Sequence, residues 1–135
     1  MKIIDVTLRD GGFVNDFNWN LSEARRHIEV CNSIGLHYIE LAYWKQNAKS
    51  NNLFYSMDES ILSELTDGLS LDTKLGVMID YHYCKKEFSE YPKIDESSID
   101  LIRITSRKED IIDAINFSRE LKDFTGLNIS FQIFF

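Results

Sequence analysis

The stretch that decides the fold lies near the amino terminus, where residues 5–12 read DVTLRDGG. The apolar, β-branched run at residues 3–8 predicts a short buried strand that ends at the Gly11-Gly12 pair. Arg9 and Asp10 then lie at the carboxyl end of this strand, and the two glycines allow the chain to turn away sharply. By itself, such a pair is interpreted either as a structural ion pair or as part of an active site.

Later apolar runs predict four further strands, at residues 37–42, 75–79, 100–104 and 129–135. The helices predicted between them begin with capping-box patterns, which are Asn20 with Glu23, Ser56 with Glu59 and Ser106 with Glu109. Gly35 and Gly126 are predicted to end the first and the last of these helices. Residues 80–98 are predicted to be irregular, with at most a short helix before Pro92.

Strands that alternate with amphipathic helices at intervals of about 30 residues form βαβ units, whose strands pair in parallel through right-handed crossovers. The fold class is therefore α/β. The strands are either the amino-terminal five strands of a TIM (β/α)₈ barrel or a complete five-stranded doubly wound parallel sheet. The length of 135 residues favours the doubly wound sheet, whereas the apolar ending, with no helix to cover it, favours the barrel. Residues 1–135 are expected to form a single domain.

The composition argues against several kinds of partner. With 15 Lys and Arg against 22 Asp and Glu, the net charge is −7, and no basic block is available to bind nucleic-acid phosphates or anionic lipid. No apolar stretch reaches signal-peptide or membrane-spanning length, so we expect a cytoplasmic protein with no nucleic-acid or membrane partner. Cys31 and Cys84 are expected to be reduced thiols, Cys31 in the core.

The string TLRDGG at residues 7–12, followed by Phe-Val-Asn-Asp-Phe-Asn-Trp at residues 13–19, carries a family resemblance. It resembles the opening of the metal-dependent lyases and aldolases that share a TLRD-type motif on a TIM barrel. This group includes 4-hydroxy-2-oxovalerate aldolase, hydroxymethylglutaryl-CoA lyase and the isopropylmalate and homocitrate synthases, and the similarity is greatest to a little-characterised branch of aldolases. The resemblance implies that the five strands are the amino-terminal part of such a barrel.

The resemblance also implies site residues. By similarity, Asp10 ligates a divalent metal, Mg²⁺ or Mn²⁺, and Arg9 steadies the enolate oxygen of a 2-oxo acid such as pyruvate. An enolate forms when a C–C bond beside a carbonyl is made or cleaved, and a hard cation together with a guanidinium stabilises it. Phe13 stands where the oxovalerate aldolases have a proton-transferring His, so the base is not identified. The family's His-x-His pair of metal ligands would lie beyond residue 135.

Two polar residues inside predicted strands are further candidates for a catalytic or site-ordering role. Alternation along residues 37–42 points Glu40 inward, away from Ile39 and Leu41, and the family has a similar Ile-Glu at the end of this strand. Arg103 lies opposite Ile102 and Ile104 by the same alternation, and the family has a similar Val-Arg-Val pattern. The alternative for Glu40 and Arg103 is a mutual interior salt bridge. Gln132 could line the same cavity by alternation alone.

The remaining signals are weaker. His82 is a possible substitute metal ligand, whereas His27 and His37 are interpreted as structural or surface residues. Aromatic residues cluster after the first two predicted strands, where they either pack long loops or form the wall of a substrate pocket. They are Phe13, Phe17, Trp19, Tyr43, Trp44, Phe54 and Tyr55.

Together these features predict a divalent-metal-dependent aldolase or lyase acting on a small-molecule 2-oxo acid, with residues 1–135 as an incomplete and inactive amino-terminal part of the catalytic barrel. Such an open half-barrel is expected to self-associate, because two strand edges and an apolar face would be left uncovered. The alternative is a non-catalytic α/β domain that binds a ligand or partner.

Overall fold

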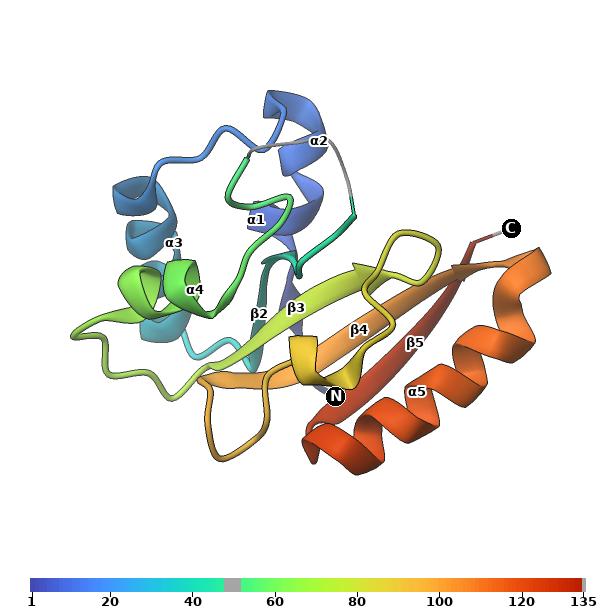
Figure 1. Ribbon diagram of the computed structural model, residues 1–135. Coiled ribbons are helices and arrows are strands. Elements are labelled where there is room, and N and C mark those ends of the chain that lie inside the picture. The colour runs from blue at the N-terminus through green and yellow to red at the C-terminus, as the bar shows by residue number, and fades with distance from the viewer. Residues whose placement is uncertain (48–51, 135) are drawn as a thin grey trace.

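The computed structural model describes residues 1–47 and 52–134, and its framework is one five-stranded sheet (Figure 1). Every adjacent pair of strands is parallel, and the spatial order follows the chain, β1-β2-β3-β4-β5. The strands are β1 (Ile4–Asp5), β2 (Tyr38–Tyr43), β3 (Lys74–Asp80), β4 (Ile99–Arg107) and β5 (Asn128–Phe134). The α/β prediction is therefore confirmed.

The strand order decides between the two predicted architectures. A doubly wound sheet reverses its strand order at a switch point, so that helices cover both faces. Here consecutive strands are always neighbours, and right-handed crossovers then place the helices on a single face. The sheet curls into a half-barrel, as in the amino-terminal part of a (β/α)₈ barrel. The doubly wound alternative is wrong.

The helices flank this sheet, with α3 and α4 beside β2 and β3 and α5 beside β4 and β5 (Figure 1). Helix α3 begins with the predicted capping box, in which Asn20 Oδ1 accepts from Glu23 N and Glu23 Oε2 accepts from Asn20 N. Helix α5 ends at Gly126, whose φ of 73° is left-handed, as predicted. The helices are α1 (Thr7–Asp10), α2 (Gly12–Asn15), α3 (Leu21–Ser33), α4 (Glu59–Thr66) and α5 (Ile111–Thr125), with short 3₁₀ turns η1 (Phe88–Glu90) and η2 (Lys108–Asp110).

The other two predicted capping boxes are wrong. Helix α4 is capped by Asp58, whose Oδ1 accepts from Ile61 N, while the preceding residue Met57 is held extended by a bridge to Trp44. Ser106 lies inside β4, because pairing with β5 extends that strand to Arg107. Where a neighbouring strand is available, sheet pairing therefore overrides a capping-box pattern in the sequence.

The first strand is shorter than predicted, and this changes the position of Arg9 and Asp10. Asp5 accepts hydrogen bonds from the backbone N–H and the hydroxyl of Thr7, an Asx turn that ends the extended conformation and starts α1. Arg9 and Asp10 thus lie on a helical turn beyond the strand. Burial alone would raise the pKa of Asp5, but hydrogen bonds from His27 and Thr7 outweigh it and lower that pKa, so the carboxylate stays ionised at neutral pH.

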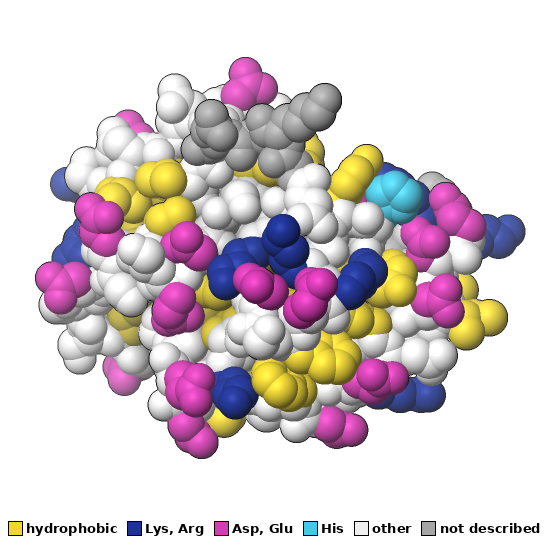
Figure 2. Space-filling view, viewed as in Figure 1, with side chains coloured by type: hydrophobic (Ala, Val, Ile, Leu, Met, Phe, Trp, Pro, Cys, Tyr) yellow, Lys and Arg dark blue, Asp and Glu magenta, His cyan; other side chains and the backbone are white. Residues whose placement is uncertain are grey.

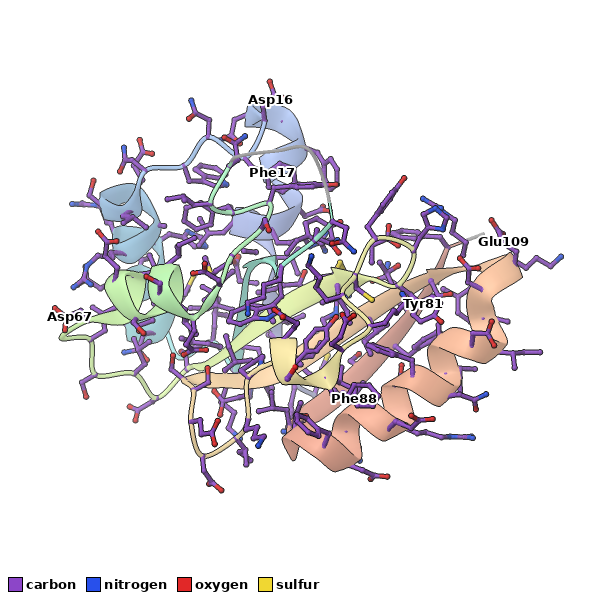
Figure 3. All side chains as sticks on the ribbon, in the orientation of Figure 1. Asp16, Phe17, Asp67, Tyr81, Phe88 and Glu109 are labelled. Carbon is purple, nitrogen blue, oxygen red and sulfur yellow. The ribbon has the colours of Figure 1, made fainter. Side chains whose placement is uncertain are left out.

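Gly11 and Gly12 follow this turn, and neither has a left-handed backbone conformation. Gly11 has a φ of −62°, an ordinary helical value. A Cβ on Gly12 would lie 2.2 Å from Cδ1 of Phe17, whose ring is buried beneath α2 (Figure 3). Gly12 is therefore required by the close approach of Phe17.

The core lies between the sheet and its helices. Tyr81 and Phe88 lie between the sheet and α5, where each packs against the ring of Phe117 (Figure 3). Helices α3 and α5 bury one face each. The buried residues of these two helices are Ala24, Ile28, Cys31, Ala114, Phe117, Ser118, Leu121 and Thr125.

Charged side chains of both signs cover the face of the molecule seen in Figure 2, with hydrophobic side chains between them. Within the described residues, no helix has the length and apolar character that crossing a bilayer requires.

We expect Gly12→Ala to lower the free energy of unfolding by about 1–3 kcal/mol, because the added methyl group displaces the buried Phe17 ring. Chemical denaturation measures the change. The matched control is Val14→Ala in the same short helix, where a 92% exposed side chain makes a change within about 0.5 kcal/mol the expected result. Equal effects of the two substitutions would contradict the space requirement at Gly12.

Candidate functional site

The centre of the candidate site is the carboxylate of Glu40, which is wholly buried in the middle of β2. Arg9 Nε donates to Glu40 Oε1 at 2.6 Å, and Arg103 Nη1 donates to Glu40 Oε2 at 2.9 Å. Both oxygens are therefore bound by guanidinium groups. These come from α1 and β4, so one carboxylate joins three separate elements.

Each arginine also donates a hydrogen bond to a second side chain. Arg9 Nη1 donates to Asp10 Oδ1 at 2.8 Å, and Arg103 Nη2 donates to Gln132 Oε1 on β5 at 2.7 Å. The side chain of Asp10 is 63% exposed, whereas that of Arg9 is buried. The network therefore runs from the interior to solvent, with Asp10 at its open end.

Arg9 and Arg103 contribute two positive charges to the network, and Glu40 and Asp10 contribute two negative charges. Of the two carboxylates only that of Glu40 is buried, whereas that of Asp10 is exposed to solvent. Burial alone would lower the pKa of Arg9, but the Coulombic attraction of Glu40 and its hydrogen bond outweigh burial and raise that pKa. Arg9 is thus held as a fixed cation.

This geometry tests the sequence-based placement of the site residues. Alternation correctly put Glu40, Arg103 and Gln132 on one face of the sheet, while Ile129 and Phe131 line a hollow with α5 on the other face. The predicted Glu40–Arg103 salt bridge is present. Two details differ from what the family pattern implies. Glu40 is the third of six residues in β2 and does not lie at the end of the strand. The carboxylate of Glu40 also binds Arg9.

Aromatic rings cover the network near Arg9. The guanidinium carbon of Arg9 lies 5.7 Å from the ring centroid of Tyr43, which contacts Phe13, Phe17 and Tyr55 with ring centroids 5.5–6.3 Å apart. Phe13 is 61% exposed, so this part of the cluster reaches the surface. Burial, together with the charge of Asp80, raises the pKa of Tyr43 against the opposing effect of Arg9, and Tyr43 remains a neutral phenol.

Three other aromatic residues of the predicted cluster have packing roles. Trp44 and Phe54 are wholly buried and belong to the core. Trp19 Nε1 donates to the carbonyl oxygen of Leu8 at 2.9 Å and so fixes the turn that carries Arg9.

The histidines lie outside this network. His37 Nδ1 accepts from Ile3 N, and His82 lies 3.5 Å from Asp110 in the loop after β3. His27 contacts Asp5 and Cys31. Within the described residues, Asp10 belongs to no cluster of three side chains able to share a metal ion. Asp10 therefore offers one exposed oxygen ligand, and the described residues do not complete a coordination shell around it.

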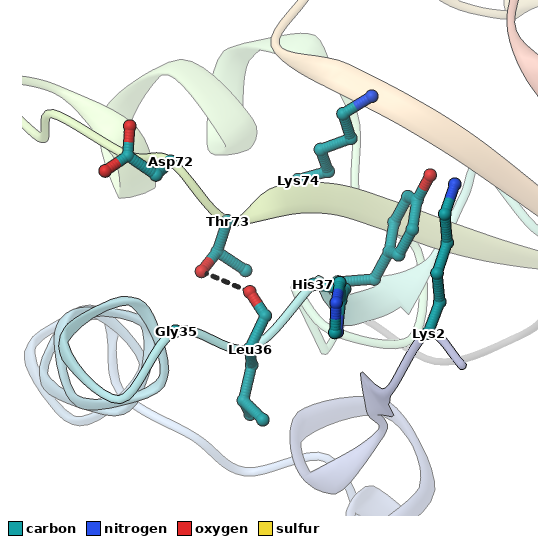
Figure 4. A pocket seen from close by; sticks show the side chains of 8 residues that line it. Lys2, Gly35, Leu36, His37, Asp72, Thr73 and Lys74 are labelled. Carbon is teal, nitrogen blue, oxygen red and sulfur yellow. Dashed lines mark hydrogen bonds between the residues drawn. The ribbon is translucent and has the colours of Figure 1, made fainter.

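A hollow of about 270 Å³ lies at the opposite, amino-terminal end of β2 and β3, where Thr73 Oγ1 donates to the carbonyl oxygen of Leu36 (Figure 4). It contains none of the predicted site residues. Its lining is Lys2, Gly35, Leu36, His37, Tyr38, Asp72, Thr73 and Lys74. Because active sites of parallel barrels lie toward the carboxyl ends of the strands, we place the candidate site at the Glu40 network.

Comparison with solved structures finds a related fold. The N-terminal domain of a putative aldolase from Bacteroides vulgatus matches 100% of this chain with a TM-score of 0.74 and 23% sequence identity. This chain spans 45% of the length of that chain. Protein-family models and curated proteins give no match. The structural match shows that the half-barrel arrangement of the five strands occurs in another protein.

We expect Glu40→Ala to lower the free energy of unfolding by about 3–5 kcal/mol, because it leaves two guanidinium groups without their shared counter-charge. Denaturant titration followed by circular dichroism measures the loss. Glu90→Ala is the control, since Glu90 pairs with Lys45 at the surface and its removal should change stability by about 1 kcal/mol or less. Similar losses in the two variants would show that Glu40 is not a structural centre.

Proposed function

We propose that this chain forms part of an aldolase or lyase that makes or cleaves a C–C bond beside the carbonyl of a 2-oxo acid through an enolate. The observation that carries the proposal is the buried Arg9–Glu40–Arg103 network, in which one buried carboxylate holds two guanidinium groups on the inner face of the half-barrel. The fold shared with the N-terminal domain of the putative aldolase supports it.

The network suits anionic substrates for a physical reason. A 2-oxo acid carries a carboxylate, and its enolate places a second negative charge on the former carbonyl oxygen. Guanidinium groups held in place before the substrate arrives stabilise such charge without reorganising. Glu40 provides this preorganisation, because it fixes Arg9 and Arg103 through separate oxygens. In the proposed reaction Arg9 contacts the enolate oxygen and Glu40 acts as a positioning residue.

Asp10 is proposed as one ligand of a divalent metal, Mg²⁺ or Mn²⁺. Its exposed carboxylate at the open end of the network has the hard oxygen donor that these ions prefer. When bound, such an ion would polarise the substrate carbonyl. The other ligands are proposed to lie outside residues 1–135, since Asp10 belongs to no cluster of three potential metal ligands within the described residues.

The position of Phe13 bears on proton transfer. Its ring lacks any group that exchanges a proton, but it packs edge-on against Tyr43 with ring centroids 6.3 Å apart. The phenol of Tyr43 stays protonated at physiological pH, so it is proposed to donate a hydrogen bond to the substrate rather than to act as the base.

Arg9→Lys is expected to lower kcat/KM for cleavage of an accepted 2-oxo acid by about 10²–10³-fold in the natural full-length protein. The charge is kept, but the planar fork that binds Glu40 and faces the oxyanion is lost. Steady-state assay of pyruvate release measures activity, and thermal denaturation measures stability. Arg119→Lys, an exposed position on α5, is the control. A large fall in melting temperature with unchanged kcat would assign Arg9 to structure alone.

Asp10→Asn is expected to weaken Mg²⁺ or Mn²⁺ binding to the full-length protein by at least about tenfold, because a neutral amide replaces the proposed anionic ligand. Isothermal titration calorimetry measures the affinity. Asp16→Asn is a matched control, since Asp16 is exposed and its left-handed backbone, with a φ of 55°, tolerates Asn. Unchanged affinity in Asp10→Asn would reject this ligand.

A further inference from the structure

A second cluster of polar side chains lies between β1 and α3, on the face of the sheet that the helices cover. His27 Nε2 lies 2.7 Å from Asp5 Oδ1 and 3.4 Å from Cys31 Sγ. His27 and Cys31 are four residues apart on α3, so their side chains share one face of that helix. The ligand atoms of all three residues lie within 4.8 Å of one another.

We propose that Asp5, His27 and Cys31 form a binding site for a thiophilic divalent cation of the Zn²⁺ type. Thiolate, imidazole and carboxylate are the protein ligands of zinc, with bonds of about 2.0–2.3 Å. Tetrahedral bonds of that length separate neighbouring ligand atoms by roughly 3.3–3.6 Å. The sulfur–nitrogen distance already fits this range, and the nitrogen–oxygen distance requires a small opening.

One ring nitrogen of His27 joins the other two side chains of this cluster. Asp5 and Cys31 both approach the same ring nitrogen of His27. A protonated Nε2 donates fully to the carboxylate but then cannot accept from the thiol, whereas an unprotonated Nε2 accepts from the thiol and repels the carboxylate. A cation in place of the single proton would bind nitrogen, sulfur and oxygen together.

The surroundings provide the remaining parts of such a site. Cys31 is buried, whereas His27 also lines a surface hollow of about 370 Å³ between α1 and α3, through which an ion and a water ligand can enter. Thr7 Oγ1 donates to the second oxygen of Asp5 at 2.9 Å and so orients the carboxylate. The sulfur ligand, which Cys31 provides when the metal displaces its thiol proton, distinguishes this site from the proposed Asp10 ligand, because Mg²⁺ prefers oxygen ligands.

The experiment is a titration of the metal-free protein with Co²⁺ and Zn²⁺, in which the absorption of cobalt–thiolate charge transfer reports sulfur ligation. We expect one equivalent to bind and Zn²⁺ to displace Co²⁺. Cys31→Ser should abolish the charge-transfer band and weaken Zn²⁺ binding by at least about tenfold. The control variants Cys84→Ser, at the other buried thiol, and His82→Asn should retain both.

A second measurement uses the unchanged protein, in case Cys31→Ser does not fold. Zinc-edge X-ray absorption of the one-equivalent complex should show one sulfur neighbour, with nitrogen or oxygen atoms as the others. A shell of nitrogen and oxygen alone, the absence of stoichiometric binding, or unchanged affinity in folded Cys31→Ser would overturn the proposal.

Discussion

The structure depends on the need to neutralise one buried anion, the carboxylate of Glu40. An isolated carboxylate in the interior is strongly unfavourable, so a fold that contains one must bring cations to it. Arg103 reaches Glu40 from 63 positions away in the sequence, and Arg9 reaches it from a different element. The carboxylate therefore fixes the position of α1 relative to β2 and β4, and α1 is the element that carries the motif residues.

The curled sheet and one glycine allow Arg103 to reach Glu40. Glu40 on β2 and Arg103 on β4 are separated by β3, whose residue in register with Glu40 is Gly76. Residues in register point to the same face, and a Cβ at Gly76 would lie 3.4–3.6 Å from its nearest neighbours, which are atoms of Leu101 on β4. The absence of a side chain at Gly76 leaves room above the middle strand, and curling the sheet brings the outer two strands closer.

Local signals predicted much of this architecture, and long-range contacts account for what they missed. Apolar runs located all five strands, and alternation within them located the shared face of Glu40, Arg103 and Gln132, because side-chain direction follows from the backbone. The capping box of α3 was correct, but those at Ser56 and Ser106 competed with sheet pairing. The sequence could not reveal that Arg9 shares Glu40, since that contact depends on α1 replacing the end of the predicted strand.

The same turn connects the two candidate sites. Asp5 binds Thr7, which starts α1, and it also binds His27 on α3. Four residues later Arg9 binds Glu40 on the inner face. Because Asp5 holds the start of the four-residue helix that presents Arg9, any change in the contacts of its carboxylate acts on the position of the guanidinium. A cation bound by Asp5, His27 and Cys31 would keep Asp5 ionised and fixed to α3, and would thereby stabilise the helical turn on which the Arg9–Glu40 contact depends.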